Sequence, residues 1–198
     1  MPRDQRSITA ADIMPLDQYE LIRADKKQEA IERKKLTRLA VGPYATVLFE
    51  NWDSMWLQIQ EMLRIEKGGD EQLADELAAY DPMVPKGREL TATVFFEIGD
   101  PDRRDAFLRT IGGVEDHISI QVGGHVIPAR AEGDTERTRA SDNKASAVHF
   151  FHFDFTPEAI AAWKSGEGNA LLVIDHPNYG HAALISADAR AFLARECF

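Results

Sequence analysis

The chain has 198 residues, a formal net charge of −10 and a single cysteine, Cys197. One thiol cannot form an internal disulfide, and it cannot supply a zinc ribbon or a cysteine-held iron–sulfur cluster. The acidic balance disfavours duplex nucleic acid as a partner unless basic residues are concentrated locally. The N-terminal segment lacks the apolar core of a signal peptide, and no apolar run approaches the roughly 20 residues that span a bilayer. These features predict a cytoplasmic protein without a membrane partner.

A long helix is predicted over about 15–40, with Pro15 at its first position. Its middle is almost wholly polar, so we expect it to pack through its ends, across another element or across a second subunit in a homodimer. Basic and acidic residues alternate over 21–40. This mixture favours a solvated helix with i,i+4 ion pairs, such as Glu29 to Arg33, over a phosphate-binding face.

A strand and two further helices complete the first half of the chain. Gly42-Pro43 ends the long helix, and 45–50 has the apolar character of a short buried strand. The helix predicted over 52–67 carries a stripe of tryptophan, methionine and aliphatic side chains at helical spacing. Core packing or a dimer interface explains this stripe better than a cofactor cleft does. Another helix is predicted over 71–80.

From residue 90 onward the apolar period changes to two, which indicates strands. The strands are predicted over 90–98, 117–122, 125–130, 145–155, 169–176 and 181–186. The nearly all-apolar strand over 169–176 is expected to be buried on both faces. The polar segment 131–145 has no apolar pattern and is expected to be a mobile surface loop or a lid.

These elements predict a single α+β domain over 1–198. A mainly antiparallel sheet of about six strands, packed by helices, occupies 90–198, and 1–80 forms an N-terminal helical layer with one short strand. The connection over 156–165 is long enough to make one strand pair parallel.

Three blocks of the sequence carry a family resemblance: GPYATVLFENWDSMWLQIQEMLR, AAYDPMVPKGRELTATVFFEI and VHFFHFDFT. They resemble an uncharacterised bacterial family, domain of unknown function 3501, and the likeness runs over nearly the whole chain. Members of that family are often encoded beside rubrerythrin-like and heterodisulfide-reductase-like iron–sulfur proteins. The resemblance therefore implies a role beside peroxide- or redox-handling partners, and it assigns no catalytic residue.

Motifs of the common enzyme classes are absent from the sequence. It contains no GxGxxG, no GxxxxGK[ST] and no GxSxG, so phosphate loops and a nucleophile elbow have no support. Glu50, Glu61 and Glu97 lie next to apolar runs. No helix carries the Glu-x-x-His pairs of a di-iron carboxylate site, which argues against such a centre inside this chain.

The stretch HFFHFDF places two histidines, His149 and His152, three residues apart. On a strand these side chains face opposite sides and cannot chelate one metal together. His149 falls in the phenylalanine row and is expected to be a buried or edge histidine whose hydrogen bonds are satisfied. His152 shares its face with Asp154, which leaves open an oriented base or a metal ligand.

A second histidine pair, His176 and His181, flanks the turn Pro177-Asn178-Tyr179-Gly180. In a hairpin closed by these four residues the two imidazoles are directly opposed, with Cβ atoms roughly 5 Å apart. They could hold zinc, iron or manganese if a third ligand converges, and His152 with Asp154 is the nearest candidate. The alternative is a surface hairpin with polar residues at its neck.

The sequence thus favours a non-enzymatic accessory or binding protein that acts as a homodimer, with a rubrerythrin-like or iron–sulfur protein as partner. The alternative is a metal-binding protein or metal-dependent enzyme that uses histidines of 149–181. Nucleic-acid binding by the basic helix is a third hypothesis, which the net charge disfavours.

Overall fold

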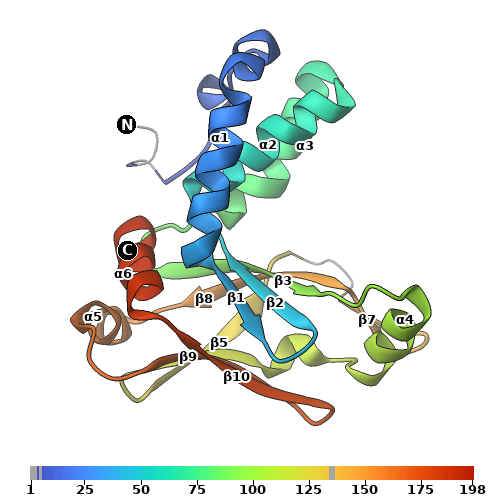
Figure 1. Cartoon of the computed structure of the whole chain (residues 1–198), viewed down its shortest axis with the longest axis vertical. Helices are drawn as coiled ribbons and strands as arrows, with labels where there is room; N and C mark the ends of the chain where they lie inside the picture. Colours follow the sequence, from blue (N-terminus) through green and yellow to red (C-terminus); the bar gives the residue numbers. More distant parts are fainter. Residues whose placement is uncertain (1–3, 5, 134–136) are drawn as a thin grey trace.

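Three helices form a layer that stands on one side of a strongly curved sheet (Figure 1). They are α1 (Leu16–Thr37), α2 (Trp52–Glu66) and α3 (Gly69–Tyr80), with short 3-10 turns at Ala10–Asp12 and Asp81–Met83. The computed structural model describes residues 4, 6–133 and 137–198. No helix in these ranges combines the length and the apolar character that crossing a bilayer requires.

The tryptophan stripe of α2 packs inside this layer. Trp52 and Trp56 stack with 6.3 Å between ring centroids, and Tyr19 of α1 meets Trp56 edge-on. The two indole N–H groups donate to the carbonyls of Ser7 and Asp12, which fixes the N-terminal segment on the helix. The predicted core packing is thereby confirmed for Trp56, which is buried.

Eight strands form one sheet in which every adjacent pair is antiparallel. Their order is β1-β2-β3-β8-β5-β4-β9-β10. The strands are β1 (Arg38–Val41), β2 (Ala45–Phe49), β3 (Glu89–Phe96), β4 (Ile118–Val122), β5 (His125–Ala131), β8 (Val148–Asp154), β9 (Ala170–His176) and β10 (Tyr179–Ile185). The remaining helices are α4 (Pro101–Thr110), the 3-10 turn Val114–His117, α5 (Pro157–Ser165) and α6 (Ala187–Cys197).

One side chain joins the two edge strands, so the sheet is a nearly closed barrel. The hydroxyl of Tyr179, at the start of β10, donates to the carbonyl of Val41 at 2.6 Å. It accepts from the backbone N–H groups of Tyr44 and Ala45 at 3.0 and 2.9 Å. These groups lie at the turn between β1 and β2, so the hydroxyl takes the place of strand pairing across the seam.

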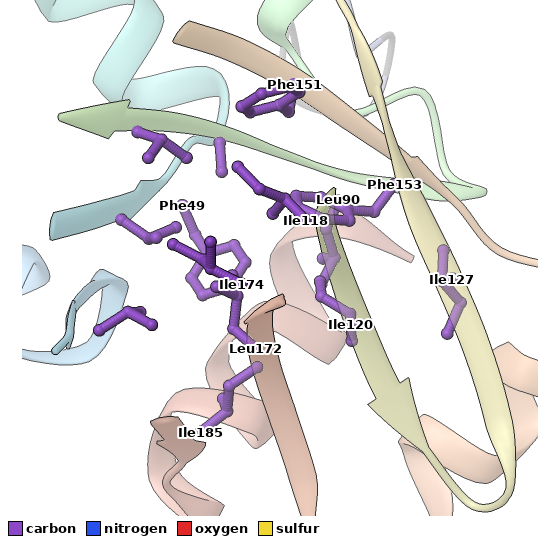
Figure 2. Close-up of a cluster of buried hydrophobic side chains, with 14 of the residues drawn as sticks. Phe49, Leu90, Ile118, Ile120, Ile127, Phe151, Phe153, Leu172, Ile174 and Ile185 are labelled. Atoms are coloured by element: carbon purple, nitrogen blue, oxygen red, sulfur yellow. The ribbon is translucent and has the colours of Figure 1, made fainter. Parts of the chain in front are cut away.

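The inward-facing side chains of the strands meet in one apolar core (Figure 2). Alternation along each strand directs every second residue inward, and these positions are aliphatic or aromatic. The labelled examples in Figure 2 are Phe49, Leu90, Ile118, Ile120, Ile127, Phe151, Phe153, Leu172, Ile174 and Ile185. The barrel interior is therefore filled by side chains.

The α+β class and the antiparallel sheet are confirmed, but the number of strands was predicted wrongly. The predicted long helix ends at Thr37, and Arg38–Val41 forms β1 by pairing with β2. β2 in turn pairs with β3, so both strands of the N-terminal half belong to the barrel. The sheet therefore has eight strands and not about six: β1 and β2 extend it beyond β3, because their backbone groups gain hydrogen bonds at its open edge.

Two finer expectations for the sheet are also wrong. The connection through α5 joins β8 to β9, which are not neighbours, so it creates no parallel pair. Burial alternates along β9, with Leu171 and Val173 half-buried and Asp175 exposed, because only one face of this strand lies against the core.

The polar segment 131–145 contains local structure of its own. β6 (Thr138–Arg139) pairs with β7 (Lys144–Ala145), and Ala145 is buried in the main core. Arg109 of α4 forms an ion pair with Asp142 at 2.7 Å, which ties the segment to that helix. The predicted mobile loop includes 134–136, which lie outside the described residues.

Candidate functional site

A cleft of about 460 Å³ lies between the helical layer and the outer face of the barrel. α1 and α2 form one wall, and β2, β3 and β8 form the other. The volume falls in the range of about 300–1,000 Å³ that is usual for small-molecule sites. The sheet wall consists of the side chains that strand alternation directs away from the core, and α1 and α2 stand over them.

The walls of the cleft are mainly apolar, and part of this apolar surface is open to water. Ile31 of α1 is 54% exposed, Phe150 of β8 is 41% exposed and Val148 is 39% exposed. Met55 of α2 and Phe95 of β3 continue the apolar surface inside. Large apolar side chains that line a concave surface and stay exposed are typical of a binding site.

A buried carboxyl group, Glu50, lies in the cleft where β2 meets the start of α2. Its two oxygens accept hydrogen bonds from the hydroxyls of Thr93 at 2.7 Å and Ser54 at 2.6 Å. Burial raises the pKa of Glu50 above its ordinary value, against the opposing effects of these hydroxyls and of the Lys34 charge. The cleft thus holds a carboxyl group whose neutral form is favoured by its surroundings.

Two lysines of α1, Lys27 and Lys34, line the cleft and form no ion pair with any residue in the described ranges. They are seven residues apart, so both lie on one helix face, with Ile31 between them. Other cations of α1 have acidic partners: Arg23 with Glu61, Lys26 with Glu29, Arg33 with Asp53 and Lys35 with Glu32. The cleft therefore has a local excess of positive charge in an acidic protein.

At one end of the cleft, a hydrogen-bonded network at Glu61 joins α1 to α2. Its carboxylate accepts from Arg23 through both oxygens, at 2.6 and 2.8 Å, and from the Tyr19 hydroxyl at 2.7 Å. The hydrogen bond from Arg23 is the main reason that the pKa of Glu61 is lowered to about 2. This carboxylate stays ionised, and its hydrogen bonds with Arg23 and Tyr19 join α1 to α2.

The arrangement suits binding better than covalent catalysis. The Ser54 hydroxyl, which donates to Glu50, also accepts from the N–H of Asn51, and its oxygen lies 3.0 Å from the Asn51 carbonyl. These bonds belong to the capping box of α2, so the serine has a structural role. What the cleft offers a ligand is apolar surface, two ammonium groups and hydrogen-bonding groups at its floor.

The histidine pair predicted at the last hairpin is not assembled as expected. The turn has only two residues, Pro177 and Asn178, so Tyr179 lies opposite His176, and His181 lies opposite Ile174. This register directs the Tyr179 ring into the core, where its hydroxyl makes the three bonds across the seam. The predicted four-residue turn is wrong because it would leave that tyrosine in the loop.

Each member of this pair has other neighbours. His176 is buried, with Nε2 3.2 Å from the Gly112 carbonyl and Nδ1 accepting from the N–H of Asn178. His181 packs on the Tyr179 ring, with 4.5 Å between centroids. His176 lies in the inward-facing row of β9, away from the outer face of β8.

The other two predicted site residues, His152 and Asp154, lie on the outer face of β8. His152 is buried between two carboxylates, with Nδ1 2.6 Å from Glu89 and Nε2 bonded to Glu132. Burial alone would lower the pKa of His152, but the hydrogen bonds and charge of Glu89, with help from Glu132, raise it. Asp154 pairs with Arg130 at 2.7 Å.

The four proposed ligands are therefore not brought together. The ring nitrogens of His152 point in opposite directions, so its two carboxylates cannot share one ion with it. Within the part of the chain that is described, no group of three or more His, Cys, Asp or Glu residues is placed to hold a metal. His149 is buried as predicted; its Nε2 lies 2.9 Å from the Ser146 carbonyl, and its Nδ1 has no partner among the described atoms.

Comparisons with known proteins place this fold in a family. The model of DUF3501, a protein family of unknown function, matches residues 7–197. The chain belongs to this family. A crystal structure of a novel protein of unknown function from Burkholderia pseudomallei K96243 is 33% identical, covers 97% of this chain and 100% of its own, and has a TM-score of 0.88. No curated protein matches.

The residues of the cleft were not identified from the sequence. In the sequence, Glu50 is one of three carboxylates next to apolar runs, and the two lysines belong to a mixed charge run. The available signal was their spacing, because Lys27, Ile31 and Lys34 share a helix face while their cationic neighbours have acidic residues three or four positions away.

Proposed function

We propose that this DUF3501 protein is a non-enzymatic binding protein that holds a small organic molecule in the cleft between its helical layer and its barrel. The observation that carries the proposal is the 460 Å³ cleft, whose apolar walls stay partly exposed. A cleft of that size with apolar walls and a few converging polar groups is the usual form of a small-molecule site. A ligand that covers the exposed side chains of Ile31 and Phe150 removes apolar surface from water, which favours binding.

The proposal includes a cytoplasmic location and an accessory role beside peroxide- or redox-handling iron proteins, rubrerythrin-like or iron–sulfur. The family resemblance supports this part. A metal-dependent role for histidines of 149–181 stays a prediction that no geometry in the described ranges favours.

We also propose that the chain forms a homodimer through its helical layer. Leu21 of α1 and Ile65 of α2 are large apolar residues that are well exposed. An ion pair between their neighbours Glu20 and Arg64, at 2.5 Å, places them at the same end of the layer. We expect light scattering to give a dimer that is weakened by the double substitution Leu21→Lys and Ile65→Lys. A monomer at high concentration of the intact chain contradicts the proposal.

Ligand binding is tested with a neutral apolar fluorophore, N-phenyl-1-naphthylamine, titrated into the purified full chain. We expect saturable binding of one probe per chain. The variant Ala30→Trp places an indole in the cleft and should weaken binding at least tenfold, because Ala30 lines the cleft. Ala24→Trp, at an exposed position of the same helix that does not line the cleft, is the matched control and should bind as the parent does.

Two outcomes would contradict the proposal. The first is no saturable binding by the parent protein. The second is equal weakening by Ala30→Trp and Ala24→Trp, which would show that the effect of the indole does not depend on the cleft. Circular dichroism of each variant confirms that the helical layer is intact.

A further inference from the structure

The charge lining the cleft favours one class of ligand. Its cationic groups are Lys27, Arg33 and Lys34, and its acidic groups are Glu50 and Glu61. Arg33 pairs with Asp53 of α2, and Glu61 pairs with Arg23. Both oxygens of buried Glu50 accept hydrogen bonds from the Ser54 and Thr93 hydroxyls, and Glu50 forms no ion pair with either lysine, so Lys27 and Lys34 are the cleft cations without an ion-pair partner in the described ranges.

The two lysines have the geometry of a single anion site. Seven residues correspond to about 10 Å along a helix axis, and each ammonium stands on a flexible four-carbon stem. Both can therefore turn toward one anionic group above Ile31. An ammonium is a point charge without the planar fork of a guanidinium, so it selects negative charge and not one particular anion geometry.

Apolar surface begins directly beside these charges. Ile31 lies between the two lysines on the helix, and Phe150 and Val148 face it from β8. The apolar surface continues to Met55 and Phe95. A ligand that satisfies both parts of the site has an anionic head and an unbranched or flat apolar body.

We infer that the ligand of the cleft is a single-chain amphipathic anion, with its head held by Lys27 and Lys34 and its apolar body on Ile31, Phe150 and Phe95. This inference rests on the proposed ligand-binding function. Charge complementarity selects the head, and the exposed apolar residues select the body. A neutral or cationic amphiphile of the same length gains the apolar contacts but not the ion pairs.

The test compares three ten-carbon probes that differ only in their heads: decanoate, 1-decanol and decyltrimethylammonium. Each is titrated against bound N-phenyl-1-naphthylamine in the full chain at low ionic strength, below the critical micelle concentration of the two ionic probes and below the solubility limit of 1-decanol. We expect decanoate to displace the fluorophore at a concentration at least tenfold lower than 1-decanol, with the cation weakest. The advantage of decanoate should shrink in 0.5 M salt, because salt screens exposed charges. Affinity should rise about fourfold per added methylene until the cleft is filled.

A matched pair of double variants separates local charge from net charge. Lys27→Gln with Lys34→Gln should remove the preference for decanoate over 1-decanol. Lys26→Gln with Lys35→Gln removes the same charge from the same helix, at lysines whose partners are Glu29 and Glu32, and should leave the preference unchanged. Decyl phosphate is an additional anionic probe: it should also bind more tightly than 1-decanol, and binding no tighter than that of 1-decanol would overturn the inference.

The outcomes distinguish this inference from the function on which it rests. If the fluorophore binds but the three probes displace it equally, the cleft binds ligands and the inference is wrong. If both double variants lose the preference to the same extent, net charge and not the lysine pair is responsible, and the inference is also wrong. If the fluorophore does not bind the parent, the proposed function fails first.

Discussion

Removal of one hydroxyl, in Tyr179→Phe, should destabilise the barrel strongly. The substitution deletes three hydrogen bonds, to the carbonyl of Val41 and from the N–H groups of Tyr44 and Ala45. Val41 and Ala45 are buried, so their polar groups lose their partner without gaining water. A buried unpaired group costs about 1–3 kcal/mol, and packing of the ring is preserved, so we expect a loss of about 2–4 kcal/mol in the free energy of unfolding. That corresponds to roughly 4–16 °C in Tm for a chain of this size.

The measurement is urea unfolding followed by circular dichroism, supported by calorimetry. Tyr44→Phe is the matched control, because the Tyr44 ring lies 6.4 Å from the Tyr179 ring and its hydroxyl has no hydrogen-bond partner in the described structure. The control should stay within about 0.5 kcal/mol of the parent. A loss below about 1 kcal/mol for Tyr179→Phe, or equal losses for both variants, would refute the assigned role of the hydroxyl at the seam.

Three further predictions follow from buried titratable groups. Because burial raises the pKa of Glu50, this carboxyl group ionises in the unfolded chain at a lower pH than in the folded protein, which destabilises the parent as pH rises above about 4. Glu50→Gln should therefore be more stable than the parent between pH 4 and 7, by about 1.4 kcal/mol for each pH unit by which the pKa is raised. Urea titrations should show no such gain below pH 4. The raised pKa of His152 contributes stability below about pH 6.5, and this contribution is lost as pH rises through the folded-state pKa. The free energy of unfolding lost in His152→Gln should therefore be largest at pH 5–6 and smaller at alkaline pH. A loss that does not depend on pH would contradict the ion pairing with Glu89 and Glu132. Burial raises the pKa of the Cys197 thiol, so native protein should resist iodoacetamide and react only in denaturant, as mass spectrometry can check; rapid native alkylation would contradict its burial.

Local pattern predicts most elements of this fold, and long-range pairing decides the remainder. The period-two runs of β3 and β8 and the capped helix α2 are legible because their periodicity is strong. Residues 38–41 continue the helical spacing of Leu36 and Leu39, so only their pairing with Ala45–Leu48 identifies them as β1. The strand count was low for that reason, since β1 depends on a sheet edge that the sequence does not display.

The last hairpin illustrates the limit for site residues. Two turn lengths, closed at His176–Tyr179 or at His176–His181, preserve the same inward and outward faces, so alternation cannot choose between them. The choice depends on where the Tyr179 hydroxyl finds partners, more than 130 residues away in the chain. The cleft is hidden for a similar reason, because Lys27 and Phe150 meet only after the helical layer is placed on the sheet.

The direct passage from α1 into β1 has a mechanical consequence. Thr37 ends the helix and Arg38 begins the strand, with no linker between them, and the N–H of Arg38 still bonds to Lys34 within the helix. One wall of the cleft and one edge of the barrel seam thus belong to one continuous segment of backbone. Because no linker separates the two elements, a tilt of α1 would be transmitted to β1 and to its contact with the Tyr179 hydroxyl. If the cleft binds a ligand as proposed, a ligand that shifts α1 would also strain the hydrogen bonds of Tyr179 at the seam.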